Sequence, residues 1–168
     1  MIDFAETVLW YYKSERNEAL WLTGFGVMVV IIDAKILLNM NSNDMLRGLF
    51  YPLLFLGLLG LFAGGFNAIN NQKRLAELPL EFAKDLRSFK IKEAERFEKS
   101  GGVNSWWMPL KIIWTGILLV GIFLGFWGVG DWWYGLAIGL LLWGVFGWVV
   151  DGFAHQRARI YTIELIKP

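Results

Sequence analysis

Asp33 is the residue whose type and position most directly indicate chemistry, because it is a carboxylate inside an otherwise apolar stretch. An ionisable group within a membrane span is costly and tends to mark an ion or proton pathway or a buried pair. Two interpretations stay open. Either Asp33 is an ion or proton site, or it pairs near the membrane surface with Arg47 or the polar turn at 39–47, while Lys35 extends outward to the headgroups. The candidate polar site within the membrane is therefore Asp33, Lys35 and Arg47.

A second group of polar residues surrounds the end of the last apolar block. It consists of Lys111, Asp151, His155, Arg157, Arg159 and Tyr161. Asp151 and His155 are four residues apart and share a helix face, as two metal ligands would, but no third ligand accompanies them. We therefore predict a solvated helix end without a metal, and a packing pair between Lys111 and Asp151.

Known catalytic patterns are absent from the sequence. It holds no Ser-His-Asp set, no phosphate-binding glycine loop and no clustered carboxylates. With no cysteine, the chain has no disulfides, thiol redox chemistry or thiolate metal sites. A net charge of +1 also argues against nucleic-acid binding. We expect a protein that is not an enzyme and needs no cofactor.

Four apolar blocks must position these side chains. The 168 residues are 56% hydrophobic with a mean hydropathy of +0.45, too apolar for a soluble domain, so residues 1–168 are predicted to form one membrane domain. About 20 apolar residues are needed to cross a membrane. The predicted spans are 20–38, 49–69, 112–129 and 132–150, with a connector at 70–111 and a tail at 151–168.

The connector decides the expected orientation. It carries nine of the sixteen lysines and arginines, so the connector, the N-terminus and the tail are predicted to be cytoplasmic in a bacterial inner membrane. From Pro79, apolar positions at 82, 86, 89 and 97 predict an amphipathic helix that ends at Ser100–Gly102. Apolar positions before residue 20 indicate a short amphipathic helix at the membrane surface or a plain lead-in helix.

Small residues recur along the spans and predict close helix packing. The candidate packing glycines are Gly60, Gly64, Gly121, Gly125, Gly135 and Gly139. Gly60 and Gly64 form a GxxxG pair, which lets two helices approach closely in lipid. These seams predict a tightly packed bundle or an oligomer.

The tail carries the most specific sequence motif. Residues 151–165, DGFAHQRARIYTIEL, resemble the D-x-F-A-x-x-R-A-x-x-Y-x-x-x-L ending of a family of small, uncharacterised bacterial four-span proteins. In that family the position of His155 is often acidic. The connector, with Leu80-Glu81-Phe82 leading into a basic helix, is also similar. The resemblance implies a fold and topology rather than an activity. The size and layout further resemble membrane immunity proteins against pore-forming bacteriocins.

Together these patterns predict an all-α integral membrane four-helix bundle of two helical hairpins, with an N-terminal amphipathic segment and a cytoplasmic amphipathic connector helix. We expect it to act by protein contact in the membrane, as an immunity or accessory protein. Its expected partners are membrane lipid and either a second copy or another membrane protein. The alternative is an oligomeric ion channel or small transporter in which Asp33 and the asparagines at 67, 70 and 71 line the path.

Overall fold

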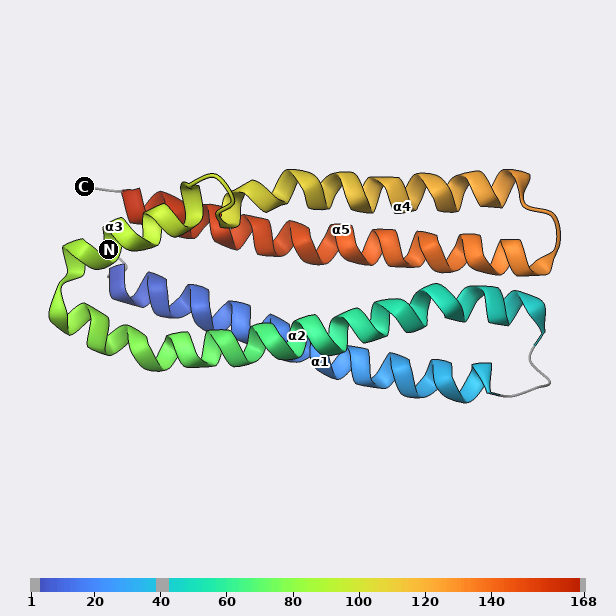
Figure 1. The fold of residues 1–168 in the computed structure, drawn as a ribbon, viewed down its shortest axis with the longest axis horizontal. Coiled ribbons are helices and arrows are strands. Elements are labelled where there is room, and N and C mark those ends of the chain that lie inside the picture. The colour runs from blue at the N-terminus through green and yellow to red at the C-terminus, as the bar shows by residue number, and fades with distance from the viewer. Residues whose placement is uncertain (1–3, 39–42, 167–168) are drawn as a thin grey trace.

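The computed structural model describes residues 4–38 and 43–166, and the described chain is helical with no strand (Figure 1). Its elements are α1 (Phe4–Leu37), α2 (Asp44–Lys84), α3 (Leu86–Glu98), the 3-10 turn η1 (Val103–Trp106), α4 (Trp107–Trp127) and α5 (Asp131–Ile166). The predicted turn at 39–47 lies partly outside the described residues. The chain is already helical from Asp44, where the Asn43 side chain caps α2 by accepting from the Leu46 amide at 2.8 Å.

Four helical stretches are long and apolar enough to cross a membrane, as the apolar blocks predicted. This is the arrangement of a multi-pass membrane protein. At 1.5 Å per residue, α4 with 21 residues is about 31 Å long, close to the ~30 Å hydrocarbon core. The 34 residues of α1 reach about 51 Å by the same measure. By this measure α1, α2 and α5 are each about 20–30 Å longer than the hydrocarbon core is thick.

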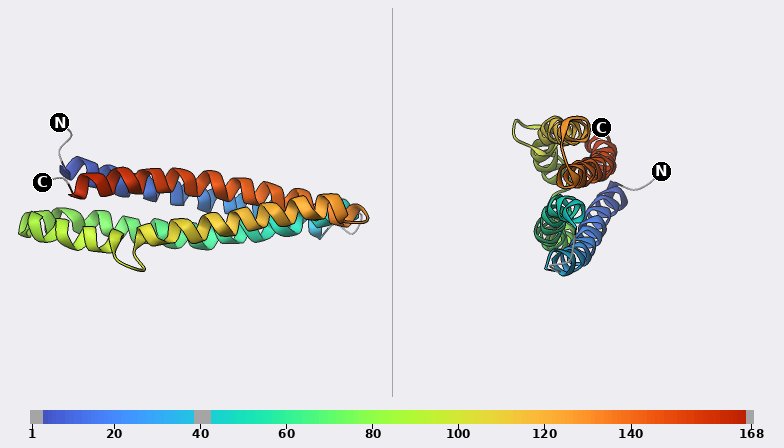
Figure 2. Two further views of the ribbon diagram at one scale, coloured as in Figure 1. Left: turned by 90° about the horizontal axis from the view of Figure 1, so that it is seen from above. Right: turned by 90° about the vertical axis from the view of Figure 1, so that its right-hand side faces the viewer.

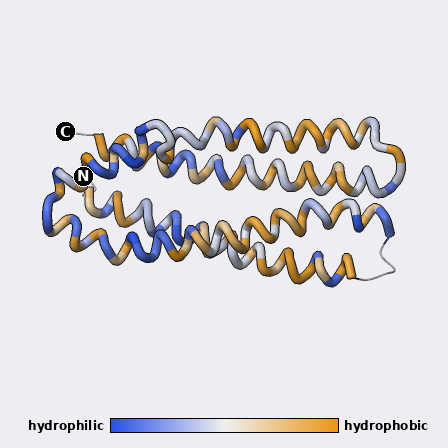
Figure 3. The backbone as a smooth tube through the Cα atoms, in the orientation of Figure 1, coloured by the Kyte–Doolittle hydropathy of each residue, from blue (hydrophilic) through white to orange (hydrophobic). Residues whose placement is uncertain are grey.

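Both described chain ends, α3 and η1 lie at the same end of the molecule, which we call the connector end (Figure 1). The last turn of α1, the first turn of α2 and the reversal between α4 and α5 lie at the other end, the turn end (Figure 1). At the turn end, Gly130 adopts a φ of +97°, a conformation that glycine takes without strain. Hydrophilic residues gather toward the connector end, and the middle of the molecule is mostly hydrophobic (Figure 3).

The long helices pack in the order α1, α2, α5, α4 (Figures 1 and 2). Helix α1 lies along α2, α2 along α5, and α5 along α4; α1 also meets α5. Among the described residues, α4 makes no packing contact with α1 or α2. Helix α4 therefore stands at one edge of the assembly and is held by α5 within the apolar region.

Glycines make the close contacts between neighbouring helices. A Cβ added at Gly139 of α5 would lie 2.6 Å from the Leu49 carbonyl oxygen of α2. Gly60 and Gly64 of α2 lie similarly close to backbone carbonyls of α1. Gly135 meets the Met45 carbonyl of α2. These positions pack helices of one chain together and are thereby occupied by internal contacts.

The two candidate packing glycines of α4 differ in their surroundings. A Cβ at Gly121 would lie 3.0 Å from the Leu141 side chain of α5, so this glycine belongs to the α4–α5 contact. Gly125 is exposed, and a Cβ there would meet only Ala137 at 3.9 Å. Gly125 therefore is not needed for close packing within the chain.

The element boundaries at the connector end differ from the sequence prediction. The N-terminal segment is no separate surface helix, because α1 runs unbroken from Phe4 through the first span. Helix α2 continues past the span and through Pro79 to Lys84, so the connector helix begins only at Leu86. Asp85 ends α2 and caps α3, accepting from the amides of Arg87 and Ser88. The tail continues α5 as helix to Ile166.

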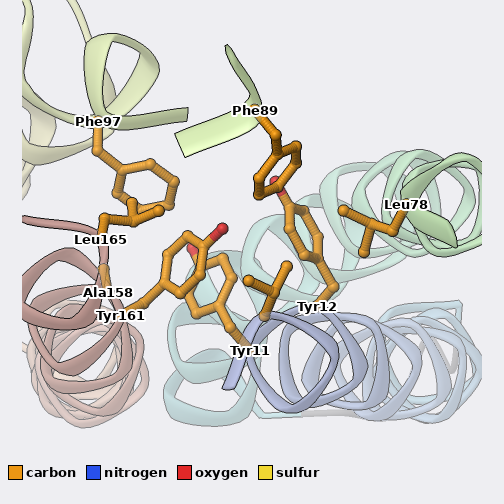
Figure 4. Close-up of a cluster of buried hydrophobic side chains, with 9 residues drawn as sticks. Tyr11, Tyr12, Leu78, Phe89, Phe97, Ala158, Tyr161 and Leu165 are labelled. Atoms are coloured by element: carbon orange, nitrogen blue, oxygen red, sulfur yellow. The ribbon is translucent and has the colours of Figure 1, made fainter. Parts of the chain in front are cut away.

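The extensions of α1, α2 and α5 enclose a core with α3 (Figure 4). We call this the connector-end core, and it consists of Val8, Tyr11, Tyr12, Leu78, Phe89, Phe97, Ala158, Tyr161 and Leu165. Its centre is aromatic: the rings of Tyr11 and Tyr161 stack at 4.4 Å, and Phe97 meets Tyr161 edge-on at 5.1 Å. Val8, Tyr11 and Tyr12 of the N-terminal segment are therefore buried in protein, whereas Trp10 is exposed.

Candidate functional site

The connector-end core surrounds a buried carboxylate, Glu93 of α3, which is 2% exposed. Glu93 lies midway between Phe89 and Phe97, one helical turn from each, so it projects from the same buried face. The hydroxyls of Tyr12 and Tyr161 both donate to its Oε1, the latter at 3.1 Å. An acid on α3 is thereby joined to α1 and α5.

Two arginines complete the environment of Glu93. Arg96 donates to Oε1 at 2.9 Å, and Arg74 of α2 reaches Oε2 at 3.4 Å. Arg96 also donates to the Tyr12 hydroxyl at 2.6 Å. Buried charges are tolerated when they are paired and hydrogen-bonded. Every helix around the core contributes at least one group to this network, so its geometry is that of a structural junction.

The tyrosines of this network are held in their protonated form. Burial, the largest cause, raises the pKa of both Tyr12 and Tyr161 far above the usual value, and the nearby Glu93 carboxylate adds to the effect. Both hydroxyls therefore remain donors to the carboxylate throughout the physiological pH range.

A second polar contact joins α1 to α5. The Arg157 guanidinium donates to Glu15 at 2.9 Å and also bonds Glu18. Burial raises the pKa of both carboxyls, while Arg157 acts in the opposite direction. We call this group the Arg157 clamp. It places one cation between two partly buried acids at the level where α1 leaves the apolar region.

The remaining basic residues of the predicted helix-end cluster line a pocket of about 410 Å³ between η1, α4 and α5. Lys111, His155 and Arg159 form its basic part, with Glu98 as its one acidic lining residue. Trp107 stacks on the His155 ring at 5.0 Å. We call this the basic pocket.

Burial and neighbouring positive charges affect the pKa of His155 within this pocket. Burial first, and then the positive charges of Lys111 and Arg159, lower the pKa of the imidazole below its usual value. The ring is therefore neutral at pH 7 and leaves Lys111 and Arg159 as the two permanent cations. No group of three or more metal-ligating side chains occurs among the described residues.

Among the described residues Asp151 forms no ion pair with Lys111, so the predicted packing pair is not found. Its carboxylate accepts instead from the Trp114 indole of α4, and this bond ties α4 to α5. The predicted helix-end cluster thus divides by helix face. Asp151 contacts Trp114, Arg157 turns to α1, and Tyr161 joins the Glu93 network, while Lys111, His155 and Arg159 share the basic pocket.

The predicted membrane site has one buried member. Asp33 is 2% exposed, and its Oδ2 has no hydrogen-bond partner among the described residues. Arg47 forms an ion pair with Asp44 at 3.7 Å. Lys35 is exposed on α1. Helix α1 ends at Leu37, so Asp33 lies one turn from the turn end.

The sequence prediction did not include Glu93, Tyr12 or Arg74 among the site residues. The apolar stripe of the connector helix has an eight-residue gap between Phe89 and Phe97, and Glu93 fills the middle of that gap. A single acid on an otherwise apolar face is the signal that could have identified it. Its partners come from α1, α2 and α5, and no local pattern indicates them.

Comparison with protein-family models, curated proteins and solved structures finds no match to the chain.

Proposed function

We propose that this chain is a non-enzymatic protein of a bacterial inner membrane, with both termini cytoplasmic, that works by contact with another protein within the membrane. The concentration of basic residues at the connector end supports this orientation. Within this proposal an immunity role against a pore-forming bacteriocin is the most concrete form. The layout of four spans with a short loop at one end and a basic connector at the other supports it by analogy.

The position of α4 is the observation that carries the proposal. This helix packs on α5 alone among the long helices, and no charged residue occurs between Ile112 and Gly130. Large side chains such as Leu119 and Phe123 are more than half exposed. The apolar window of this span is also the least buried of the four, at 6% against 11–22%, so the open side of α4 is the surface we assign to a second membrane helix.

Site-specific photocrosslinking tests this surface. A photoreactive residue replaces Leu119 on α4, and the control carries it at Ile31 on α1, which is equally exposed at 63% against 59%. We expect a discrete protein adduct from position 119 in intact bacterial membranes and none from position 31. The same adducts from both positions, or adducts to lipid alone, would contradict protein contact through α4.

The immunity form has its own test. Cells that express the chain are exposed to a panel of purified pore-forming bacteriocins, and survival is compared with cells that carry an empty vector. Protection against one member, lost when bulky residues replace Leu119, supports the proposal. If every bacteriocin kills the expressing cells and the empty-vector cells equally, the immunity form is wrong. The crosslinking test of protein contact is separate from this outcome.

The burial of Asp33 favours a second candidate, an oligomeric ion channel or small transporter. A carboxylate that is 2% exposed with one unpartnered oxygen in a span is the kind of group that conducts protons or ions. Flux into liposomes separates the two functions. A conduit loses flux in Asp33→Asn and keeps it in Asp44→Asn, an exposed acid of the same end. A contact protein shows no flux above empty liposomes.

A further inference from the structure

We infer that the basic pocket and the adjoining surface of α4 form a binding site for one anionic phospholipid. The phosphate is bound by Lys111 and Arg159, and one acyl chain lies along α4 toward the middle of the membrane. The site rests on the basic pocket rather than on the proposed contact partner, although its groove shares Leu119 with the surface proposed for that partner.

The cations of the basic pocket lack the counter-charges that other arginines of this end possess. Arg74, Arg96 and Arg157 each pair with carboxylates. Lys111 and Arg159 form no ion pair or hydrogen bond among the described residues, although both line the same pocket. Their mutual repulsion is relieved by a bound anion, and phosphate oxygens accept from guanidinium and ammonium donors.

The wall of the pocket is ordered by its own hydrogen bonds. Asn104 accepts from the Trp107 indole at 3.3 Å and donates to the Thr162 hydroxyl at 3.4 Å. Trp107 in turn stacks on His155. The pocket therefore has a fixed aromatic side, and a tryptophan at this level is typical of the membrane–water interface.

An apolar groove of about 380 Å³ continues from the basic pocket. It is lined by Met108, Lys111, Ile112, Thr115, Gly116 and Leu119, so the two cavities share Met108 and Lys111. A Cβ added at Gly116 would meet no atom within 4 Å, which makes this glycine an open notch on the surface of α4. The groove is apolar beyond Lys111.

The length of this groove fits one acyl chain. From Met108 to Leu119 the helix rises about 16 Å at 1.5 Å per residue. One leaflet of a hydrocarbon core ~30 Å thick spans about 15 Å. A soluble phosphate would contact only the cations of the basic pocket and would leave the apolar groove empty. A phospholipid fills both, because its phosphate binds the cations and its acyl chain lies beside Gly116. The single carboxylate at the pocket, Glu98, leaves the site net positive when His155 is neutral.

Lipid retention measured by native mass spectrometry tests the site. The purified full chain in mild detergent is titrated with phosphatidylglycerol or with phosphatidylcholine. We expect one phosphatidylglycerol to bind in preference. In the double variant Lys111→Gln, Arg159→Gln its affinity should fall about thirtyfold, since each basic residue near a membrane surface contributes roughly a fivefold preference for anionic lipid.

Two matched controls accompany that variant. Arg87→Gln with Lys99→Gln removes the same charge from exposed positions of the connector outside both cavities, and should change the affinity less than twofold. Gly116→Phe fills the groove, and Gly24→Phe introduces the same residue at an equally open site of α1. We expect Gly116→Phe to weaken phosphatidylglycerol binding and Gly24→Phe to leave it unchanged.

Several outcomes overturn the inference. Equal binding of the two lipids removes the selectivity for anionic headgroups. Equal losses in the two double variants show a diffuse charge effect. Full affinity in Gly116→Phe, or displacement of the lipid by millimolar inorganic phosphate, shows that the pocket binds a soluble anion rather than a lipid.

Discussion

Replacing Glu93 with Gln tests the structural junction of the connector end. This carboxylate receives donors from Tyr12, Tyr161, Arg74 and Arg96 while it is 2% exposed. Gln keeps the shape and one acceptor oxygen, but it removes the charge and adds an NH₂ group that faces other donors. The substitution therefore removes the charge with little change in volume and leaves some of the donors without an acceptor.

The expected cost follows from the burial of each donor. A hydrogen bond to a charged group contributes roughly 1.5–3 kcal/mol, and the two buried tyrosine hydroxyls donate to no other acceptor among the described residues. The arginine side chains are 22% and 45% exposed, so water screens part of their loss. Arg74 also keeps a bond to Glu81 at 2.6 Å. We expect the free energy of unfolding to fall by ~3 kcal/mol.

Thermal unfolding in mild detergent, followed by tryptophan fluorescence, measures this loss. For a chain of this size, ~3 kcal/mol corresponds to a decrease in Tm of roughly 6–12 °C. The control Glu95→Gln removes an exposed acid from the same helix and should change the free energy by less than about 0.5 kcal/mol. Tyr161→Phe keeps the ring stacked on Tyr11 and should cost about 1 kcal/mol. Equal Tm values for the Glu93 and Glu95 variants would refute the junction.

Three further predictions concern other parts of the chain. Arg157→Gln leaves two partly buried glutamates of α1 without their cation and should destabilise the protein by about 2 kcal/mol relative to Arg159→Gln. Because burial already raises the pKa of both glutamates, their charged forms oppose folding, so this loss should increase as the pH rises from 5 to 8 in denaturant titrations. His155 is the single histidine, and its NMR titration midpoint should lie below 6.5; a midpoint above that value would contradict the positive surroundings. Gly139→Ala places a methyl group against the α2 backbone and should lower the Tm, whereas Gly152→Ala meets open space and should not.

The spans were predictable because their causes are local. In lipid every backbone amide and carbonyl must be bonded within the segment, so a long apolar run becomes a helix whatever its neighbours are. The four apolar blocks correspondingly lie in the four helical stretches that are long enough to cross a membrane. The reversal at Gly130 is local in the same sense, because its positive φ favours glycine.

The predicted polar sites depended more on context. The spacing of Asp151, His155 and Arg159 places them on one helix face, yet Asp151 bonds Trp114 of α4 rather than Lys111. Arg157 lies on another face and reaches α1. Helical spacing in the sequence shows which residues share a helix face. It does not show which helix packs against that face.

The amino-acid sequence alone determined the helical class, the four apolar stretches and the segregation of positive charge to one end, because each depends on the composition of a contiguous segment. Only the tertiary structure decided that the helices continue beyond the apolar region and enclose a core around Glu93. Outside lipid, water competes for the backbone hydrogen bonds, so a helix persists there chiefly through packing against other helices. That packing joins residues as far apart in the sequence as Tyr11 and Tyr161, and no local sequence pattern specifies such pairs.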